Sequence, residues 1–90
     1  MIQQHVDLTF ALPLSRENAM KLVAVTDSFA SAIFFRGQNF SINGKSLLGL
    51  MALRQDKSET LIMECDGYDE KEAAKQVLSA LESYKNIDKL

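Results

Sequence analysis

The side chains that could take part in chemistry are few in this sequence of 90 residues. It has one histidine, His5, and one cysteine, Cys65. Two serines, Ser15 and Ser46, each stand directly before a stretch with helical character. A hydroxyl at that position caps the helix, and a phosphate added there is favoured by the helix N-terminus. Since a serine hydroxyl is a poor nucleophile without an adjacent base, no enzyme activity is expected.

The histidine and the cysteine do not form a recognisable site. Cys65 ends the apolar run TLIMEC, which is typical of a buried small hydrophobic residue rather than a reactive thiol. His5 stands beside Asp7 in an alternating stretch and is expected on the surface. One histidine and one cysteine are too few for a structural zinc site, and no glycine-rich phosphate loop is present, so no metal or cofactor is predicted.

Composition indicates a single globular domain over residues 1–90. Apolar residues make up 47% and charged residues 24%, which argues against disorder. The net charge of −2 and the absence of a basic stripe argue against nucleic-acid binding. The sequence shows neither a signal-peptide pattern nor an apolar run that approaches a membrane span, so a cytoplasmic protein without membrane contact is expected.

Hydrophobic periodicity predicts seven elements in the order strand, helix, strand, strand, helix, strand, helix. The expected ranges are 2–10, 16–28, 31–36, 39–42, 47–53, 59–65 and a last helix that begins after Asp69. Asp69 and Glu72 have the spacing of a capping box, and residues 85–90 are expected to fray. Strands with one apolar face, together with helices to cover it, predict a two-layer α+β domain whose other sheet face is open to water.

The stretch NGKSLLGLMAL, residues 43–53, carries a family resemblance. With this element order and chain length, the sequence resembles HPr, the small phosphocarrier of the bacterial phosphoenolpyruvate–sugar phosphotransferase system. The start of the last helix, DGYDEKEAA, also fits that family. The residues that match its regulatory segment are Lys45, Ser46, Gly49, Met51 and Leu53.

The resemblance implies a fold and two surface sites. The fold is an open-faced β-sandwich, in which a four-stranded antiparallel sheet is covered on one face by three helices. In Firmicutes the serine at the position of Ser46 is phosphorylated by a dedicated kinase. The family positions that form an exposed apolar docking patch across the first two helices correspond to Met20, Leu47, Leu48 and Met51. A reorganised core without a partner is the alternative interpretation of these four residues.

The head of the first helix departs from the family pattern Gly-x-His-Ala-Arg-Pro. Ser15 stands at the position of the phosphoryl-accepting histidine, and Glu17 stands at that of the helper arginine. Asn18 replaces the proline, while Arg16 keeps one positive charge nearby. An imidazole nitrogen accepts a phosphoryl group that it can pass on, whereas a serine ester has lower transfer potential and Glu17 repels phosphate.

The family's strand order adds a prediction for the open sheet face. It makes the second and fourth strands neighbours, so Phe34 and Ile62 are expected to pair across them on the outward face. An apolar pair there indicates self-association as a weak homodimer or contact with a second partner. A register shift of one residue would remove this inference.

Three hypotheses follow from these residues. The first is a non-catalytic regulatory paralogue that binds phosphotransferase-system components, a serine kinase or a transcriptional regulator, with Ser46 as the switch. The second is an accessory phosphocarrier that accepts phosphate at a non-standard residue. The third is an interaction domain without phosphorylation.

Overall fold

The computed structural model describes residues 1–56 and 58–84, and it contains the seven elements in the predicted order. Their bounds are β1 (Ile2–Val6), α1 (Arg16–Asp27), β2 (Ala32–Arg36), β3 (Ser41–Asn43), α2 (Leu47–Ala52), β4 (Leu61–Asp66) and α3 (Glu70–Glu82). The prediction that residues 85–90 fray lies outside the described residues.

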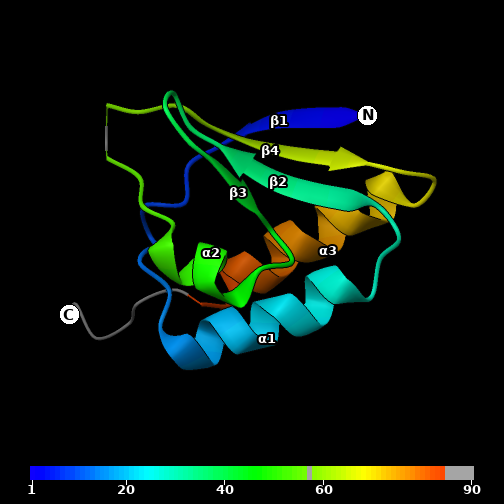
Figure 1. Cartoon of the computed structure of the whole chain (residues 1–90), viewed down its shortest axis with the longest axis horizontal. Helices are drawn as coiled ribbons and strands as arrows, with labels where there is room; N and C mark the ends of the chain where they lie inside the picture. Colours follow the sequence, from blue (N-terminus) through cyan, green and yellow to red (C-terminus); the bar gives the residue numbers. More distant parts are fainter. Residues whose placement is uncertain (57, 85–90) are drawn as a thin grey trace.

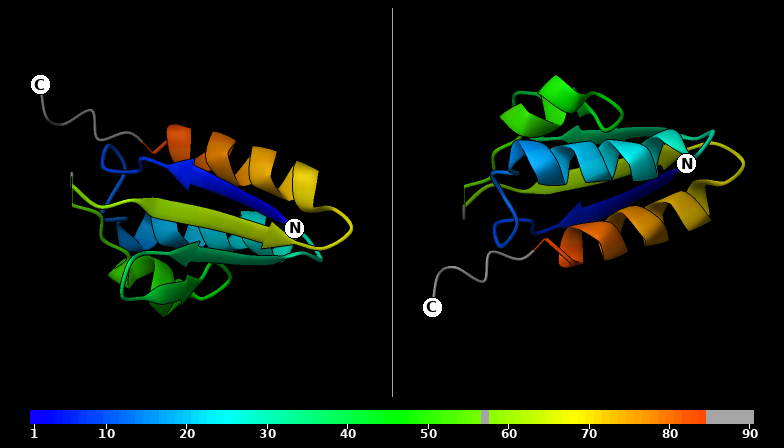
Figure 2. Two further views of the ribbon diagram at one scale, coloured as in Figure 1. Left: turned by 90° about the horizontal axis from the view of Figure 1, so that it is seen from above. Right: turned by 90° about the horizontal axis from the view of Figure 1, so that it is seen from below.

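The four strands form one antiparallel sheet in the order β1-β4-β2-β3. All three helices lie against one face of this sheet, and Figure 1 shows the strand layer above the helix layer. In Figure 2 the strands lie in front of α1 when the molecule is seen from above and behind it when seen from below. The α+β prediction, with a four-stranded antiparallel sheet covered on one face by three helices, is therefore confirmed.

The core lies between the sheet and the helices because alternate strand residues point the same way. Ile33 and Phe35 of β2 are fully buried, and so are Met63 and Cys65 of β4. Full burial of a side chain the size of Ile33, Phe35 or Met63 contributes roughly 1.5–3 kcal/mol. The helices supply the opposing apolar residues Ala19, Leu22, Leu50, Ala73, Ala74, Val77 and Leu81.

Both predicted serine caps are confirmed. Ser15 Oγ accepts a hydrogen bond from the amide of Asn18 at 3.0 Å, and α1 begins at Arg16. Ser46 Oγ accepts from the amide of Gly49 at 3.0 Å, and α2 begins at Leu47. Each cap satisfies one of the amides that the first turn of a helix leaves without an internal partner.

Three predicted strand ranges are wrong at one end by two or more residues. The fourth strand begins at Leu61 rather than residue 59, and it ends at Asp66. The first strand ends at Val6 rather than residue 10, because the Asp7 carboxylate accepts from the amide and hydroxyl of Thr9 and turns the chain. The third strand covers Ser41–Asn43 rather than residues 39–42, because the turn that begins at Gly37 is closed by a hydrogen bond from its amide to Phe40 O.

The capping box predicted at Asp69 is also wrong. Asp69 occupies the N-cap position of α3, but its side chain makes no capping hydrogen bond. The carboxylate instead accepts from the amides of Ala30 and Ser31, at 2.9 and 3.0 Å, and from the Ser31 hydroxyl. Asp69 therefore joins the start of α3 to the segment that enters β2, 38 residues earlier in the sequence.

The turn before α3 requires glycine for lack of space. A Cβ atom at Gly67 would lie 2.5 Å from Ser31 Oγ and 2.7 Å from Ser31 Cα. Because the second neighbour is backbone, the contact cannot be relieved by rotating a side chain. Gly67 thus allows the β4–α3 turn to pack directly on Ser31, beside the Asp69 contacts.

Candidate protein-docking surface

Four apolar residues predicted to form a docking patch lie on neighbouring helices. We call Met20, Leu47, Leu48 and Met51 the α1–α2 surface. Met20 is 53% exposed and Leu48 is 79% exposed, whereas Leu47 and Met51 are half-buried and pack against the core. Two of the four side chains therefore present most of their apolar area to solvent, and the other two are anchored in the core.

Ser46 lies at the edge of this surface and is held by a tight local structure. Its half-buried hydroxyl caps α2, and a Cβ at Gly49 would lie only 3.2 Å from it and 3.0 Å from Ile42 Cγ2. Lys45 Nζ donates to Phe29 O at 2.7 Å, which ties the preceding residue to the end of α1. A phosphate on Ser46 would place its negative charge directly beside Leu47 and Leu48.

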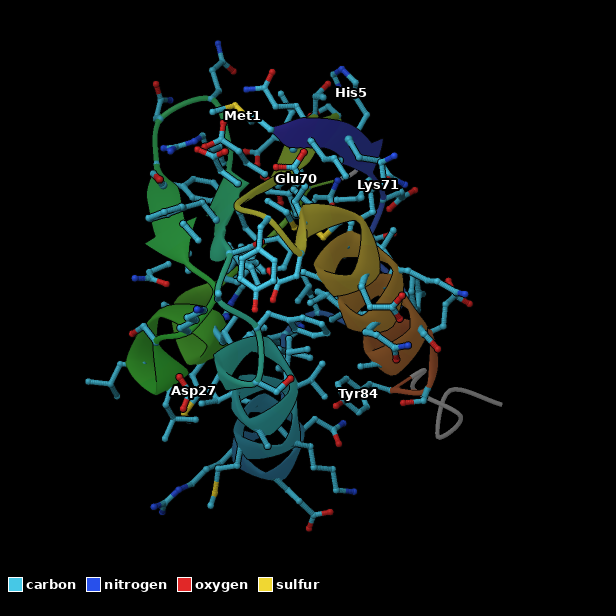
Figure 3. All side chains as sticks on the ribbon, turned by 90° about the vertical axis from the view of Figure 1, so that its right-hand side faces the viewer. Met1, His5, Asp27, Glu70, Lys71 and Tyr84 are labelled. Atoms are coloured by element: carbon cyan, nitrogen blue, oxygen red, sulfur yellow. The ribbon has the colours of Figure 1, made fainter. Side chains whose placement is uncertain are left out.

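The head of α1 carries charged and polar side chains on the surface. Ser15, Arg16 and Glu17 are exposed, and the Glu17 carboxylate lies 3.5 Å from Lys21 Nζ one turn along the helix. The sequence contains one histidine, His5, which lies on β1 and points away from the helices (Figure 3). The imidazole is therefore on the open sheet face and not at the head of α1.

The open sheet face is organised around Glu64, which is only 8% exposed. Its carboxylate accepts from Gln3 Nε2 at 2.8 Å and from Nη2 of Arg36 at 2.9 Å. Arg36 also donates from Nη1 to Ser41 Oγ at 2.6 Å, and its guanidinium carbon lies 4.9 Å from the centre of the Phe34 ring. The Arg36 hydrogen bonds, followed by the one from Gln3, lower the pKa of Glu64 below its ordinary value.

This arrangement corrects the predicted pairing of Phe34 with Ile62. Both residues belong to the open face, but the register places Phe34 opposite Glu64 and Ile62 opposite Arg36. Phe34 and Ile62 are diagonal neighbours, and Arg36 covers the Phe34 ring. The outward apolar surface is therefore divided by a charged pair, and self-association through these two residues stays a prediction.

The sequence analysis missed the pair of Arg36 and Glu64. A signal for it exists, because the two opposite charges stand at outward positions of strands expected to be neighbours. The signal is weak, since the register between the strands decides whether these charges meet.

Cys65 is buried, as the sequence predicts, and burial raises the pKa of its thiol to about 11. Within residues 1–56 and 58–84, no three His, Cys, Asp or Glu side chains are grouped so that they would hold a metal ion. In the same described ranges, none of the helices is both long and apolar enough to cross a bilayer.

Comparison with known proteins identifies the family. Residues 2–83 match the family model described as the HPr component phosphorylation site of the phosphotransferase system. The chain belongs to the HPr family. The phosphocarriers of this family are not enzymes, in agreement with the prediction of a non-enzymatic protein.

Individual relatives cover almost the whole chain. The phosphocarrier protein HPr of Neisseria meningitidis serogroup A is 29% identical over 84 residues, which span 93% of this chain and 94% of the relative. A crystal structure of HPr from Thermoanaerobacter tengcongensis is 26% identical, covers 93% of this chain and 94% of its own, and superimposes with a TM-score of 0.77.

The family also includes a similar protein with a different name. The crystal structure of Crh, described as a catabolite repression protein of Bacillus subtilis, is 26% identical and superimposes with a TM-score of 0.69. The match covers 96% of this chain and 99% of that one. Its description reports a swapped, intertwined dimer. Proteins described as an HPr phosphocarrier and as a catabolite repression protein therefore both superimpose on this chain.

Proposed function

We propose that this chain is a non-catalytic, regulatory member of the HPr family that binds protein partners through the α1–α2 surface. The observation that carries the proposal is the placement of His5 on β1, while the exposed N-cap of α1 is Ser15. A carrier needs a nitrogen that accepts a phosphoryl group at high transfer potential, and a capping serine does not provide one.

The charges around Ser15 support the same conclusion. Glu17 lies in the first turn of α1, so its carboxylate repels a dianionic phosphate instead of binding it. Lys21, one turn along the helix, forms an ion pair with Glu17. The Glu17 carboxylate therefore already neutralises part of the partial positive charge at the N-terminus of α1.

Binding is assigned to the exposed apolar residues. Met20 and Leu48 together offer flexible and branched apolar side chains on two neighbouring helices, which suits a partner that buries them in a pocket. The proposed partners are a phosphotransferase-system component, a serine kinase or a transcriptional regulator, in the cytoplasm. The description of the relative Crh as a catabolite repression protein supports a regulatory partner.

Ser46 is the proposed switch. A phosphoserine carries about −1.5 to −2 charges near neutral pH, and here they would lie beside Leu47 and Leu48. The modification would replace the hydroxyl that caps α2 with phosphate oxygens able to accept from the same amide. The expected result is a retained helix with a changed surface charge, so that one class of partner is lost or gained.

An accessory phosphocarrier is the second candidate. It is favoured by the family model, which is described by its phosphorylation site, and by the HPr proteins among the relatives. The residue accepting phosphate would then be His5 or a serine. This candidate and the first one differ in a property that can be measured directly.

The deciding experiment incubates the purified chain with labelled phosphoenolpyruvate and the general phosphotransferase enzyme. A histidine-containing HPr serves as the positive control, and His5→Ala is the variant of the chain. We expect no acid-labile label on the parent chain. Acid-labile label that disappears in His5→Ala would overturn the proposal and establish the carrier.

A second experiment addresses the regulatory part. Intact mass and peptide analysis of the protein from its native cell is expected to find phosphate on Ser46. If Ser46→Ala behaves as the parent does in cells and no phosphate is found, the interaction domain without phosphorylation replaces the switch.

A further inference from the structure

The amide side chain of Gln55 occupies an unusual place between two strands. Gln55 lies in the connection from α2 to β4, and it is half-buried. Its Oε1 accepts from the amide of Leu8 at 2.7 Å, and its Nε2 donates to Val6 O at 3.2 Å. A longer contact of 3.4 Å joins Nε2 to Glu59 O.

The register explains what this amide replaces. Val6 is the last residue of β1 and pairs with Leu61, the first residue of β4. If the ladder continued, Leu8 would stand opposite Glu59. The Gln55 amide reaches the backbone on both sides of this gap, where it offers one donor and one acceptor as a peptide group does. It thus supplies the pairing that β1 loses when the two strands separate.

The contact leads directly to the head of α1. Leu8 O accepts from the amides of Ala11 and Leu12, at 2.9 and 3.0 Å, and forms the turn that precedes Ser15. The side chains of Leu8, Leu12 and Leu14 are buried. A shift of Leu8 would therefore move residues 8–14, which lead into α1. On the other side, Gln55 follows Leu53, the buried C-cap of α2, by two residues.

We propose that Gln55 is a positioning residue that fixes the head of α1 relative to the end of α2, and with it the geometry of the α1–α2 surface. This inference rests on the proposed function for its biological meaning, because the α1–α2 surface is the proposed docking site. The geometric part stands on the hydrogen bonds of Gln55 and is tested without any partner.

The test uses three variants. Gln55→Leu keeps a similar volume but removes both polar atoms, and Gln55→Glu keeps an acceptor for Leu8 while it sets a second oxygen against Val6 O. Gln38→Leu is the matched control, because Gln38 is an exposed glutamine in the β2–β3 turn. Amide hydrogen exchange at Leu8 and residual dipolar couplings in α1 and α2 are measured for each chain by NMR.

We expect the exchange of the Leu8 amide to become about tenfold faster in Gln55→Leu, because one partly buried hydrogen bond is lost. The dipolar couplings of α1 are expected to change relative to those of α2, while Gln38→Leu matches the parent in both measurements. Unchanged exchange at Leu8 would refute the contact. Faster exchange with unchanged helix couplings would refute the positioning role.

Gln55→Glu adds a pH-dependent measurement, which would not change if residue 55 only filled space. The backbone oxygens of Val6 and Glu59 contact this side chain and favour the protonated form of a carboxyl there. The acidic residues Asp7, Asp56 and Glu59 of the same segments act in the same direction, whereas Arg54, directly before position 55, acts in the opposite one. The protonated form again has one donor and one acceptor. At pH 7 the ionised carboxylate can still accept from the Leu8 amide, but it repels Val6 O, so we expect Leu8 protection in Gln55→Glu to be weaker at pH 7 than near pH 5, with no such change in the parent. Equal protection at both pH values would contradict the proposal.

Partner affinity separates this inference from the proposed function. With a partner captured by the parent chain, Gln55→Leu is expected to bind on the order of tenfold more weakly, as for the loss of one interaction of moderate strength. If the parent binds no partner, the proposed function fails, while the exchange and coupling measurements still decide the role of Gln55. If the helices reorient and affinity stays the same, the link from Gln55 to docking is wrong.

Discussion

The α1–α2 surface and the open sheet face differ in how they expose apolar side chains. On the α1–α2 surface, Met20 and Leu48 extend into solvent. On the open face, the Phe34 ring is covered by Arg36, whose guanidinium is in turn held by Glu64. The first region leaves apolar area available to a partner, whereas the second uses a charged pair to organise its own surface.

This difference indicates which substitutions should change binding and which should change stability. An exposed side chain with few contacts inside the protein contributes little to folding, so its apolar character is free to serve recognition. A nearly buried carboxylate with several donors is coupled to the strands that hold those donors. Substitutions in one region should therefore affect a property that substitutions in the other region leave unchanged.

The largest expected effect is on partner binding by Leu48→Asp. A charge on this 79% exposed side chain would have to enter an apolar pocket of the partner. We expect affinity to fall by about 2 kcal/mol or more, roughly 30-fold, and the free energy of unfolding to change by less than about 0.5 kcal/mol. Titration calorimetry and urea unfolding measure the two quantities.

Tyr68→Asp is the control for that variant, because Tyr68 is 91% exposed in the β4–α3 turn, outside the α1–α2 surface. It is expected to bind as the parent does. If both variants weaken binding equally, general charge and not the docking surface is responsible, and the contrast between the two regions is lost.

On the open face, Arg36→Ala is expected to lower stability and leave partner affinity unchanged. The substitution removes the strongest partners of Glu64 and the cover of the Phe34 ring. Among the residues that the structure describes, Gln3 then remains as the one side-chain donor to that carboxylate, so the pKa of Glu64 should rise towards its ordinary value. Urea midpoints, compared with Gln38→Ala, and NMR titration of the Glu64 carboxyl measure these changes.

A smaller effect, on the free energy of unfolding, is expected at Ser46, which caps α2 at the edge of the α1–α2 surface. Ser46→Ala removes the cap of α2 and should cost about 1 kcal/mol, whereas Ser46→Asp retains an oxygen acceptor for the Gly49 amide and should cost less. Thermal unfolding of both variants gives the comparison. Equal destabilisation by Ala and Asp would show that the hydrogen bond from Gly49 contributes nothing measurable.

The smallest expected change is in the acid dependence of stability at Asp69, whose carboxylate contacts stabilise the fold at neutral pH and lose their effect only in acid. Hydrogen bonds from the Ser31 hydroxyl and then from the Ala30 amide lower the pKa of Asp69 below its ordinary value. The folded state therefore binds this proton less readily than the unfolded state, so the stabilisation is present above the unfolded pKa of about 3.9 and is lost as pH falls through the lower folded value.

Asp69→Asn removes this titration. Urea midpoints of the parent should fall more steeply than those of the variant as pH decreases through this range. Parallel curves for the two proteins would show that the carboxylate contacts do not differ between the folded and unfolded states.

The sequence was sufficient to predict the order of the helices and strands and which face of most of them is buried. Residues 33 and 35 alternate with outward neighbours, and residues 61, 63 and 65 do the same, so the buried side of each strand follows from a period of two. Ser15 and Ser46 were predicted as caps because the preference of serine for this position depends on contacts within one helical turn.

The features that were missed depend on contacts between distant segments. The register of β2 and β4 decides that Phe34 meets Glu64 and not Ile62, and no local pattern reports a shift of that kind. Asp69 has the local spacing of a capping residue but finds stronger donors at Ala30 and Ser31. Gln55 gave no signal either, because a side-chain amide can pair with backbone groups from any segment that the fold brings near.

The close packing of Gly67 on Ser31 has a consequence for how this sequence can vary. A side chain at position 67 would require the backbone at residue 31 to move, and residues 30 and 31 are the donors that bind Asp69. Two short segments, residues 30–31 and 66–69, therefore constrain each other although 35 or more positions separate them along the chain. Among homologues we expect these segments to change together: a relative without glycine at position 67 should also differ in the length or conformation of the segment that leads into β2.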